Sequence, residues 1–63
     1  MYKYNVNLDV AKDLNSPYEN YFVSFKSPVL LSDRDIRQQA INLVPDQYIS
    51  FGWFTRTIEQ EGV

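Results

Sequence analysis

The sequence predicts a small α+β domain with the element order β-β-α-β, and three features lead to this prediction. Residues 2–10 alternate between apolar and polar side chains, the period of two that is typical of a half-buried strand. A capped amphipathic helix over residues 32–44 follows two such strands, and a third strand follows the helix. Since the chain has 63 residues, we expect residues 1–63 to form a single small domain.

The first strand is expected from Tyr2 to Val10, with one apolar and one polar face. Because a sheet with one apolar face needs a cover on that side, this strand indicates a helix packed on one face of the sheet. The apolar face holds Tyr2, Tyr4, Val6, Leu8 and Val10, and the polar face holds Lys3, Asn5, Asn7 and Asp9.

The second strand is expected to begin near Asn20, after a long loop. The loop, Ala11–Glu19, is rich in turn-forming side chains, so we expect some mobility there. Alternation continues over residues 21–26, and Pro28 then ends the pairing or marks an edge strand, because proline cannot donate to a ladder.

The helix has the clearest boundaries. Ser32 is a favourable N-cap, and Asp35 stands three residues later as in a weaker form of the capping box. Leu31 and Ile36 have the spacing of a hydrophobic staple, and Pro45 ends the helix. The apolar stripe is formed by Ile36, Ala40, Ile41, Leu43 and Val44.

The third strand is expected over Tyr48–Ile58. Gly52 within it indicates a bulge or a close approach of another backbone. A bulge would change the alternation of faces, so the direction of Phe54 stays open. A right-handed helical crossover from the second strand to the third leaves one position between them, which the first strand fills. The expected three-stranded antiparallel sheet, in the order 2-1-3, resembles half of a ferredoxin-like split β-α-β unit in topology.

Composition limits the classes of partner. Six Lys and Arg against eight Asp and Glu give a net charge of −2, whereas nucleic-acid binding normally shows a basic excess. The chain has no cysteine and no histidine, which excludes disulfides and a cysteine zinc site. No apolar run is long enough to span a bilayer, and the first residues are not a signal peptide. We therefore expect a cytoplasmic protein without membrane contact.

The sequence offers little for catalysis or for a cofactor. General acid–base chemistry needs histidine or carboxylates held in a pocket, and a domain of this size has little room for a deep one. Asp33 and Asp35 fit a role at the helix N-terminus, and the two glycines are isolated, so no phosphate-binding loop is present. We expect no enzyme activity, no cofactor and no metal. The oxygen-rich set around the first loop matches no calcium motif; it comprises Asp9, Asp13, Asn15 and Glu19.

The aromatic side chains are the strongest indication of a binding function. The expected alternation puts one group of them on the core face: Tyr21, Phe25, Phe51 and Trp53. It puts Phe22 and Tyr48 on the opposite face, with Phe54 there too if the strand has no bulge. Charged side chains lie beside them, so the candidate partner-binding face consists of Phe22, Lys26, Tyr48, Phe54 and Arg56.

Three interpretations of this face are open. Aromatic and arginine side chains anchor protein interfaces, which predicts a non-enzymatic accessory module that binds a protein or a second copy of itself as a homodimer. The alternative is a module that stacks single-stranded nucleic-acid bases, although the net charge is negative. In the third interpretation, which has the same weight as the protein interface, these aromatic side chains only cover the outer face of the first strand. Chains of this size are often accessory or inhibitor proteins of phages or other mobile elements, and we expect such a role.

Overall fold

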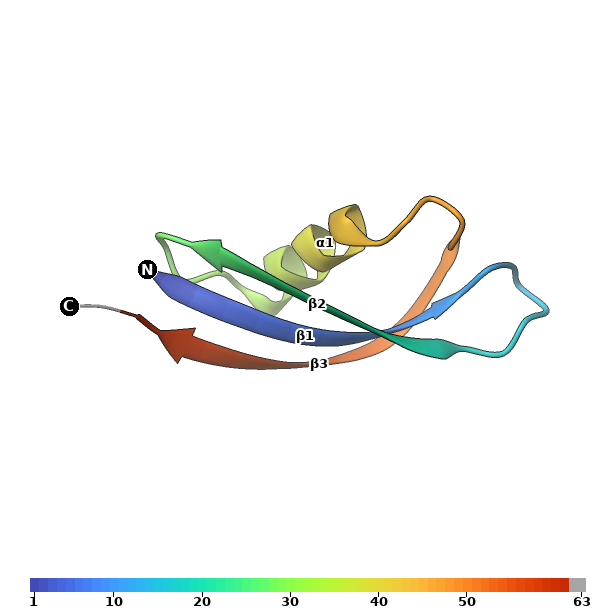
Figure 1. Cartoon of the computed structure of the whole chain (residues 1–63), viewed down its shortest axis with the longest axis horizontal. Helices are drawn as coiled ribbons and strands as arrows, with labels where there is room; N and C mark the ends of the chain where they lie inside the picture. The colour runs from blue at the N-terminus through green and yellow to red at the C-terminus, as the bar shows by residue number, and fades with distance from the viewer. Residues whose placement is uncertain (62–63) are drawn as a thin grey trace.

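The computed structural model of the chain describes residues 1–61 and has the predicted order β-β-α-β (Figure 1). The elements are β1 (Tyr2–Ala11), β2 (Glu19–Ser27), α1 (Asp33–Leu43) and β3 (Ser50–Gln60). The strands form one antiparallel sheet in the order β2-β1-β3, which confirms the predicted fold class and topology. No helix within residues 1–61 has the length and apolar character needed to cross a membrane.

The core lies between α1 and the central strand β1. The alternation of β1 translates directly into burial, because its even-numbered side chains from residue 4 to residue 10 are fully buried. α1 covers them with Ile36 and Ala40. Burying a side chain of this size stabilises the fold by about 1.5–3 kcal/mol, so this cluster supplies most of the apolar stabilisation. Its buried members are Tyr4, Val6, Leu8, Val10, Val23, Ile36, Ala40 and Val44.

The connection from β2 to α1 is held by a tyrosine and a helix cap. The Tyr4 hydroxyl donates a hydrogen bond to the carbonyl of Val29 (3.1 Å) and accepts one from the N–H of Leu31 (2.8 Å). The next residue, Ser32, is the N-cap, and its Oγ accepts a hydrogen bond from the N–H of Asp35 at 3.3 Å. The helix therefore begins where the sequence predicts, with its first turn anchored to β1.

β3 contains the bulge that Gly52 indicated. The register with β1 pairs Leu8 with Phe54 but Val10 with Phe51, so two residues of β3 face one residue of β1. A bulge of this kind changes the parity of the faces on either side of it. As a result Phe51 and Phe54 both pack against the core from the same side of the sheet.

The bulge corrects two sequence predictions. Trp53 was expected in the core, but it points to the other face and is 79% exposed. Phe54 was left open between the two faces, and it lies on the core side beside Leu8. An unbulged strand would have produced the opposite arrangement, because a shift of one residue exchanges every side chain between faces.

The helix covers the sheet unevenly. α1 packs mainly against β1 and β2, so the inner side of β3 after Phe54 is left largely without a cover (Figure 1). Every residue of β3 from Thr55 to Gln60 is exposed, including Ile58, which faces the same side of the sheet as Tyr4. β3 is thus an edge strand that is accessible from its faces and from its outer edge.

Candidate functional site

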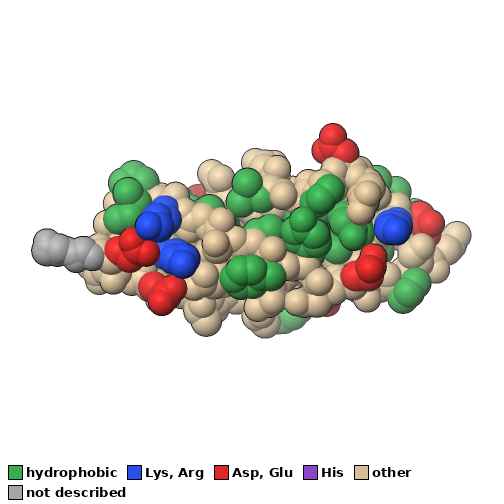
Figure 2. Space-filling model, viewed as in Figure 1, with side chains coloured by type: hydrophobic (Ala, Val, Ile, Leu, Met, Phe, Trp, Pro, Cys, Tyr) green, Lys and Arg blue, Asp and Glu red, His purple; other side chains and the backbone are tan. Residues whose placement is uncertain are grey.

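The face of the sheet opposite α1, here called the open face, is polar along most of its length. It carries the odd-numbered side chains of β1, the even-numbered side chains of β2 and the matching positions of β3. In Figure 2 charged side chains gather at the end of the molecule with the C-terminus and again toward the opposite end, and hydrophobic side chains lie between them. The open face includes Lys3, Asn5, Asn7, Asp9, Asn20, Phe22, Ser24, Lys26, Trp53, Thr55, Thr57 and Glu59.

At the end of the open face near the C-terminus, charged side chains contact partners within the chain. Lys26 Nζ lies 3.0 Å from Glu61 Oε2. The side-chain amide of Asn5 donates to Glu59 Oε2 at 2.8 Å and to Thr57 Oγ1 at 3.3 Å. Lys3 and Lys26 lie opposite each other, with Glu59 next to Lys3 and Glu61 next to Lys26. This end therefore carries both signs of charge and does not form the continuous basic stripe that tracks a phosphate backbone.

Three partly exposed aromatic side chains lie further along the sheet, toward the β1–β2 loop. Tyr18, Phe22 and Trp53, which we call the aromatic patch, are 55%, 57% and 79% exposed. Phe22 lies opposite Asn7 of β1, so amide and aromatic groups alternate there. Exposed aromatic side chains that gather on one surface, with polar groups around them, are typical of interaction sites.

Gly52 allows one member of the patch to approach the sheet. A Cβ placed on Gly52 would lie 3.3 Å from two ring atoms of Tyr18 and 3.4 Å from the Cβ of Asp9. The Tyr18 hydroxyl also lies 3.4 Å from Ser50 Oγ, within hydrogen-bonding distance. The missing side chain at Gly52 therefore lets the Tyr18 ring lie against β3.

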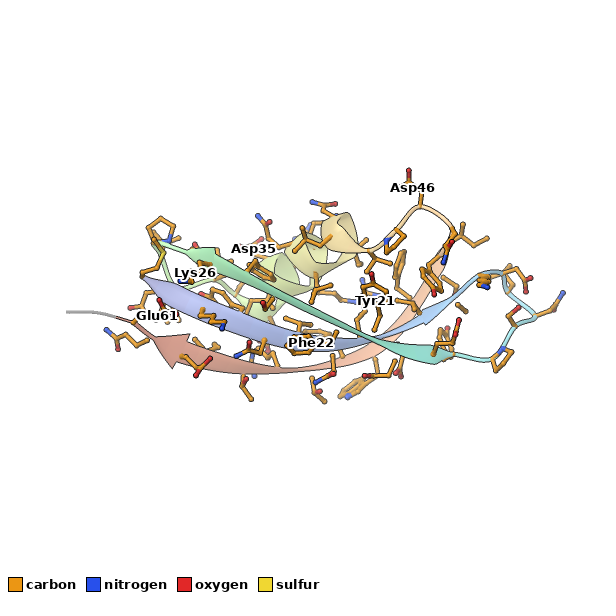
Figure 3. All side chains as sticks on the ribbon, viewed as in Figure 1. Tyr21, Phe22, Lys26, Asp35, Asp46 and Glu61 are labelled. Atoms are coloured by element: carbon orange, nitrogen blue, oxygen red, sulfur yellow. The ribbon has the colours of Figure 1, made fainter. Side chains whose placement is uncertain are left out.

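Two of the five residues predicted for the partner-binding face lie on the open face. Phe22 and Lys26 extend from the same strand on the side away from α1 (Figure 3). The prediction is wrong for Tyr48, which packs against the core with its ring centroid 5.9 Å from that of Tyr21. It is also wrong for Phe54, because the bulge turns that side chain inward.

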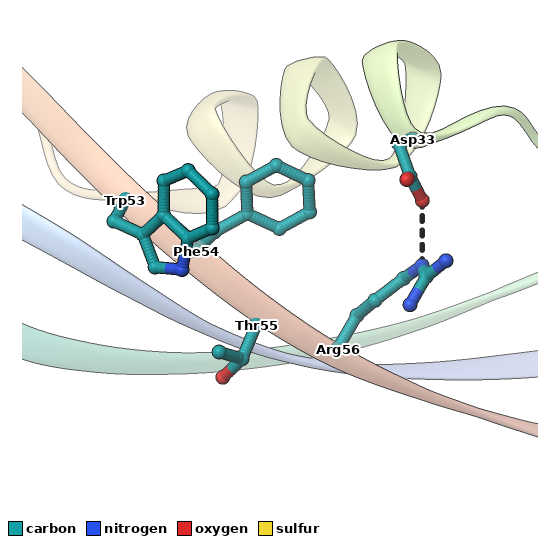
Figure 4. Close-up of a pocket in the computed structure, with 5 residues that line it drawn as sticks. All are labelled: Asp33, Trp53, Phe54, Thr55 and Arg56. Carbon is teal, nitrogen blue, oxygen red and sulfur yellow. Dashed lines mark hydrogen bonds and ion pairs between the residues drawn. The ribbon is translucent and has the colours of Figure 1, made fainter.

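Arg56 also lies on the side of the sheet that carries α1, where it pairs with Val6 of β1. Its Nε donates to Asp33 Oδ1 at 2.6 Å, across the gap between β3 and the first turn of α1 (Figure 4). The same bulge accounts for this position. The predicted set is therefore divided between the two faces, and it does not form one surface.

An open hollow of about 420 Å³ lies along β3 beside this ion pair. The one carboxylate in its lining, Asp33, is bonded to Arg56. The lining comprises Asp33, Trp53, Phe54, Thr55 and Arg56 (Figure 4). Phe54 and Arg56 line it from the side of α1 and Trp53 and Thr55 from the open face, so the hollow follows the uncovered outer edge of β3.

The oxygen-rich loop set has a local structural role. Asp13 accepts a hydrogen bond from the N–H of Asn15 at 2.8 Å. The side-chain hydrogen bond with Ser16, followed by this backbone bond, lowers the pKa of Asp13 below its ordinary value. Across residues 1–61, no three acidic side chains come close enough together to hold a metal ion.

Sequence reasoning missed Trp53 and Tyr18 as members of the site. The available signal was Gly52 directly before a tryptophan, because a bulge at that position turns the tryptophan outward. Tyr18 had no comparable signal, since it lies in a loop whose path the sequence does not define. No protein-family model, no curated protein and no solved structure matches the chain.

Proposed function

We propose that the protein is a non-enzymatic accessory module that binds a protein partner through the aromatic patch on its open face. The observation that carries this proposal is the 79% exposure of Trp53, a residue fixed by strand pairing on both sides of the bulge. Tryptophan, tyrosine and phenylalanine are the side chains that most often anchor protein interfaces. Strands present Phe22 and Trp53 with little loss of conformational entropy on binding.

A protein partner fits this face better than a nucleic acid does. The open face carries Lys3 and Lys26 against Asp9, Glu59 and Glu61, and Lys26 already pairs with Glu61. Binding of single-stranded nucleic acid relies on a positively charged groove as well as on stacking. The amide and hydroxyl groups around the patch supply instead the polar rim that is usual at protein interfaces.

The test compares two double variants of the full chain as baits for crosslinking in cell extract. Phe22→Ser with Trp53→Ser removes two members of the patch. Val29→Ser with Leu30→Ser is the matched control, because those side chains are 58% and 65% exposed but lie outside the sheet. We expect the first pair to lose a partner that the wild type and the control retain. Equal capture by all three proteins would contradict the proposal, provided that circular dichroism shows all three folded.

The nucleic-acid alternative has a separate outcome. Trp53 is the single tryptophan of the chain, so its fluorescence reports directly on stacking. We expect no quenching by single-stranded oligonucleotides at physiological salt. Strong quenching that disappears as salt is raised would favour the alternative, because phosphate contacts weaken steeply with salt. The cytoplasmic location and the phage or mobile-element role stay predictions.

A further inference from the structure

The outer edge of β3 carries backbone groups that point away from the sheet. At the two ends of the β1–β3 pairing, Glu61 N–H donates to the carbonyl of Met1 (2.8 Å) and Ile49 N–H donates to that of Ala11 (3.0 Å). Bonded and non-bonded pairs alternate in an antiparallel ladder, so the odd-numbered residues of β1 direct their backbone groups to β3. The residues of β3 that direct theirs outward are therefore Phe54, Arg56, Ile58 and Gln60.

One part of the β3 edge is hydrogen-bonded within the chain, and the other part is free to pair. By the same alternation the carbonyl of Phe51 points outward, and it accepts a hydrogen bond from the Arg37 guanidinium at 3.3 Å. The bulge at residues 52–53 interrupts the edge next to it. From residue 54 to residue 60, no hydrogen bond within residues 1–61 reaches the outward backbone groups. Natural proteins rarely leave so long an edge unprotected.

We propose that this free edge pairs with the same edge of a second copy, antiparallel about a two-fold axis at Thr57, and forms a six-stranded sheet. In this register Phe54 meets Gln60 of the second copy, and Arg56 meets Ile58 of the second copy. Every outward N–H and C=O between Phe54 and Gln60 then finds a partner. The proposal goes beyond the aromatic patch, because it concerns the edge of the sheet and not its open face.

The side chains of β3 are compatible with antiparallel pairing between two copies of this strand. The aliphatic part of Arg56 covers Ile58, an apolar side chain that is 38% exposed in the single chain. On the open face Thr57 meets itself and Thr55 meets Glu59, so no like charges stand opposite each other. Pairing about Arg56 instead would set two guanidinium groups side by side, which is unfavourable. Pairing about Thr57 therefore avoids the like-charge contact of that register and pairs all the outward backbone groups from Phe54 to Gln60.

The other edge of the sheet, on β2, carries its own features that disfavour pairing. α1 packs against β2, and the inward side chain Val23 is already buried. Its outward backbone groups belong to the even-numbered residues, where Lys26 places a charge near the edge and Pro28 follows the strand end. Lysine and proline are two devices by which native edges avoid pairing.

The test measures the mass of the full chain in solution by sedimentation. Ile58→Pro removes an outward N–H without removing a bond to β1, and Ser24→Pro is the matched change on the β2 edge. We expect a wild-type dimer that dissociates across a hundredfold dilution from about 1 mM. Ile58→Pro removes two intermolecular hydrogen bonds from each dimer, so it should weaken dimerisation roughly thirtyfold, while Ser24→Pro leaves it unchanged.

A second variant distinguishes loss of dimerisation from loss of the fold. Ile58→Lys keeps the backbone N–H but places a charge on the paired edge, and it should also give a folded monomer by circular dichroism. A wild type that is monomeric at every concentration would overturn the proposal. So would a dimer that both Ile58 variants leave intact, or that Ser24→Pro dissociates. Each of these results leaves the aromatic patch untested, so failure here is distinguishable from failure of the proposed function.

Discussion

Replacing Tyr4 by phenylalanine tests the contact that fastens the β2–α1 connection to the core. The change keeps the ring, which is fully buried and stacks on Phe25 with a centroid distance of 5.2 Å. It removes the hydroxyl, and with it the hydrogen bonds to the carbonyl of Val29 and from the N–H of Leu31. Each bond contributes about 1 kcal/mol net, so we expect a loss of about 2 kcal/mol.

That loss is large for this chain, because a core of this size supplies only ~3–5 kcal/mol of net stability. The measurement is urea unfolding followed by far-ultraviolet circular dichroism. With a slope of about 1 kcal/mol/M, the midpoint should fall by about 2 M while the slope stays constant. Ring fluorescence is less suitable, since Trp53 is already exposed in the folded state.

Tyr21→Phe is the matched control. Its hydroxyl makes no side-chain hydrogen bond within residues 1–61, so its removal should change the free energy of unfolding by less than about 0.5 kcal/mol. If Tyr4→Phe costs no more than this control, the hydroxyl does not hold the connection, and the account of the helix start is refuted.

Three further predictions concern the cap, the bulge and the loop. Ser32→Ala should cost about 1 kcal/mol in thermal unfolding, because the Asp35 N–H loses its acceptor; an unchanged melting temperature would contradict the cap. Gly52→Ala should cost less than about 1 kcal/mol, since the half-exposed Tyr18 ring can move aside, and the cost should vanish in a Tyr18→Ala background; equal costs in both backgrounds would refute the contact. The pKa of Asp13, followed by nuclear magnetic resonance, should lie below 3.8 and rise toward that value in Ser16→Ala. Because the folded pKa is the lower one, this stabilisation is complete above pH 3.8 and is lost as the pH falls through the folded pKa; a wild-type value at or above 3.8 would contradict it.

Local signals in the sequence were sufficient for the elements and their order. The alternation of β1 produced a face that is fully buried from Tyr4 to Val10, and Ser32 caps α1 as predicted. The 2-1-3 order followed from the handedness of the crossover and from the room it leaves for one strand. These features depend on a few neighbouring residues or on general chain geometry, so a single sequence is sufficient to predict them.

The candidate site was less predictable because it depends on where β3 shifts its register. Gly52 indicated a bulge, but the sequence does not say on which side of the glycine the extra residue falls. That choice turns Trp53 outward and brings Phe54 and Arg56 to the side of α1. The position of Tyr48 has a different cause, since its contact with Tyr21 forms in the link before β3, where strand alternation does not apply.

The exposure of Trp53 is the most direct test of the proposed binding face. As the single tryptophan, it can be followed by acrylamide quenching of the wild-type chain at low micromolar concentration. With 79% of the residue exposed, we predict a water-exposed emission spectrum and quenching almost as efficient as that of free tryptophan. Blue-shifted emission that acrylamide quenches poorly would place Trp53 in the core, and it would contradict both the bulge and the aromatic patch built on it.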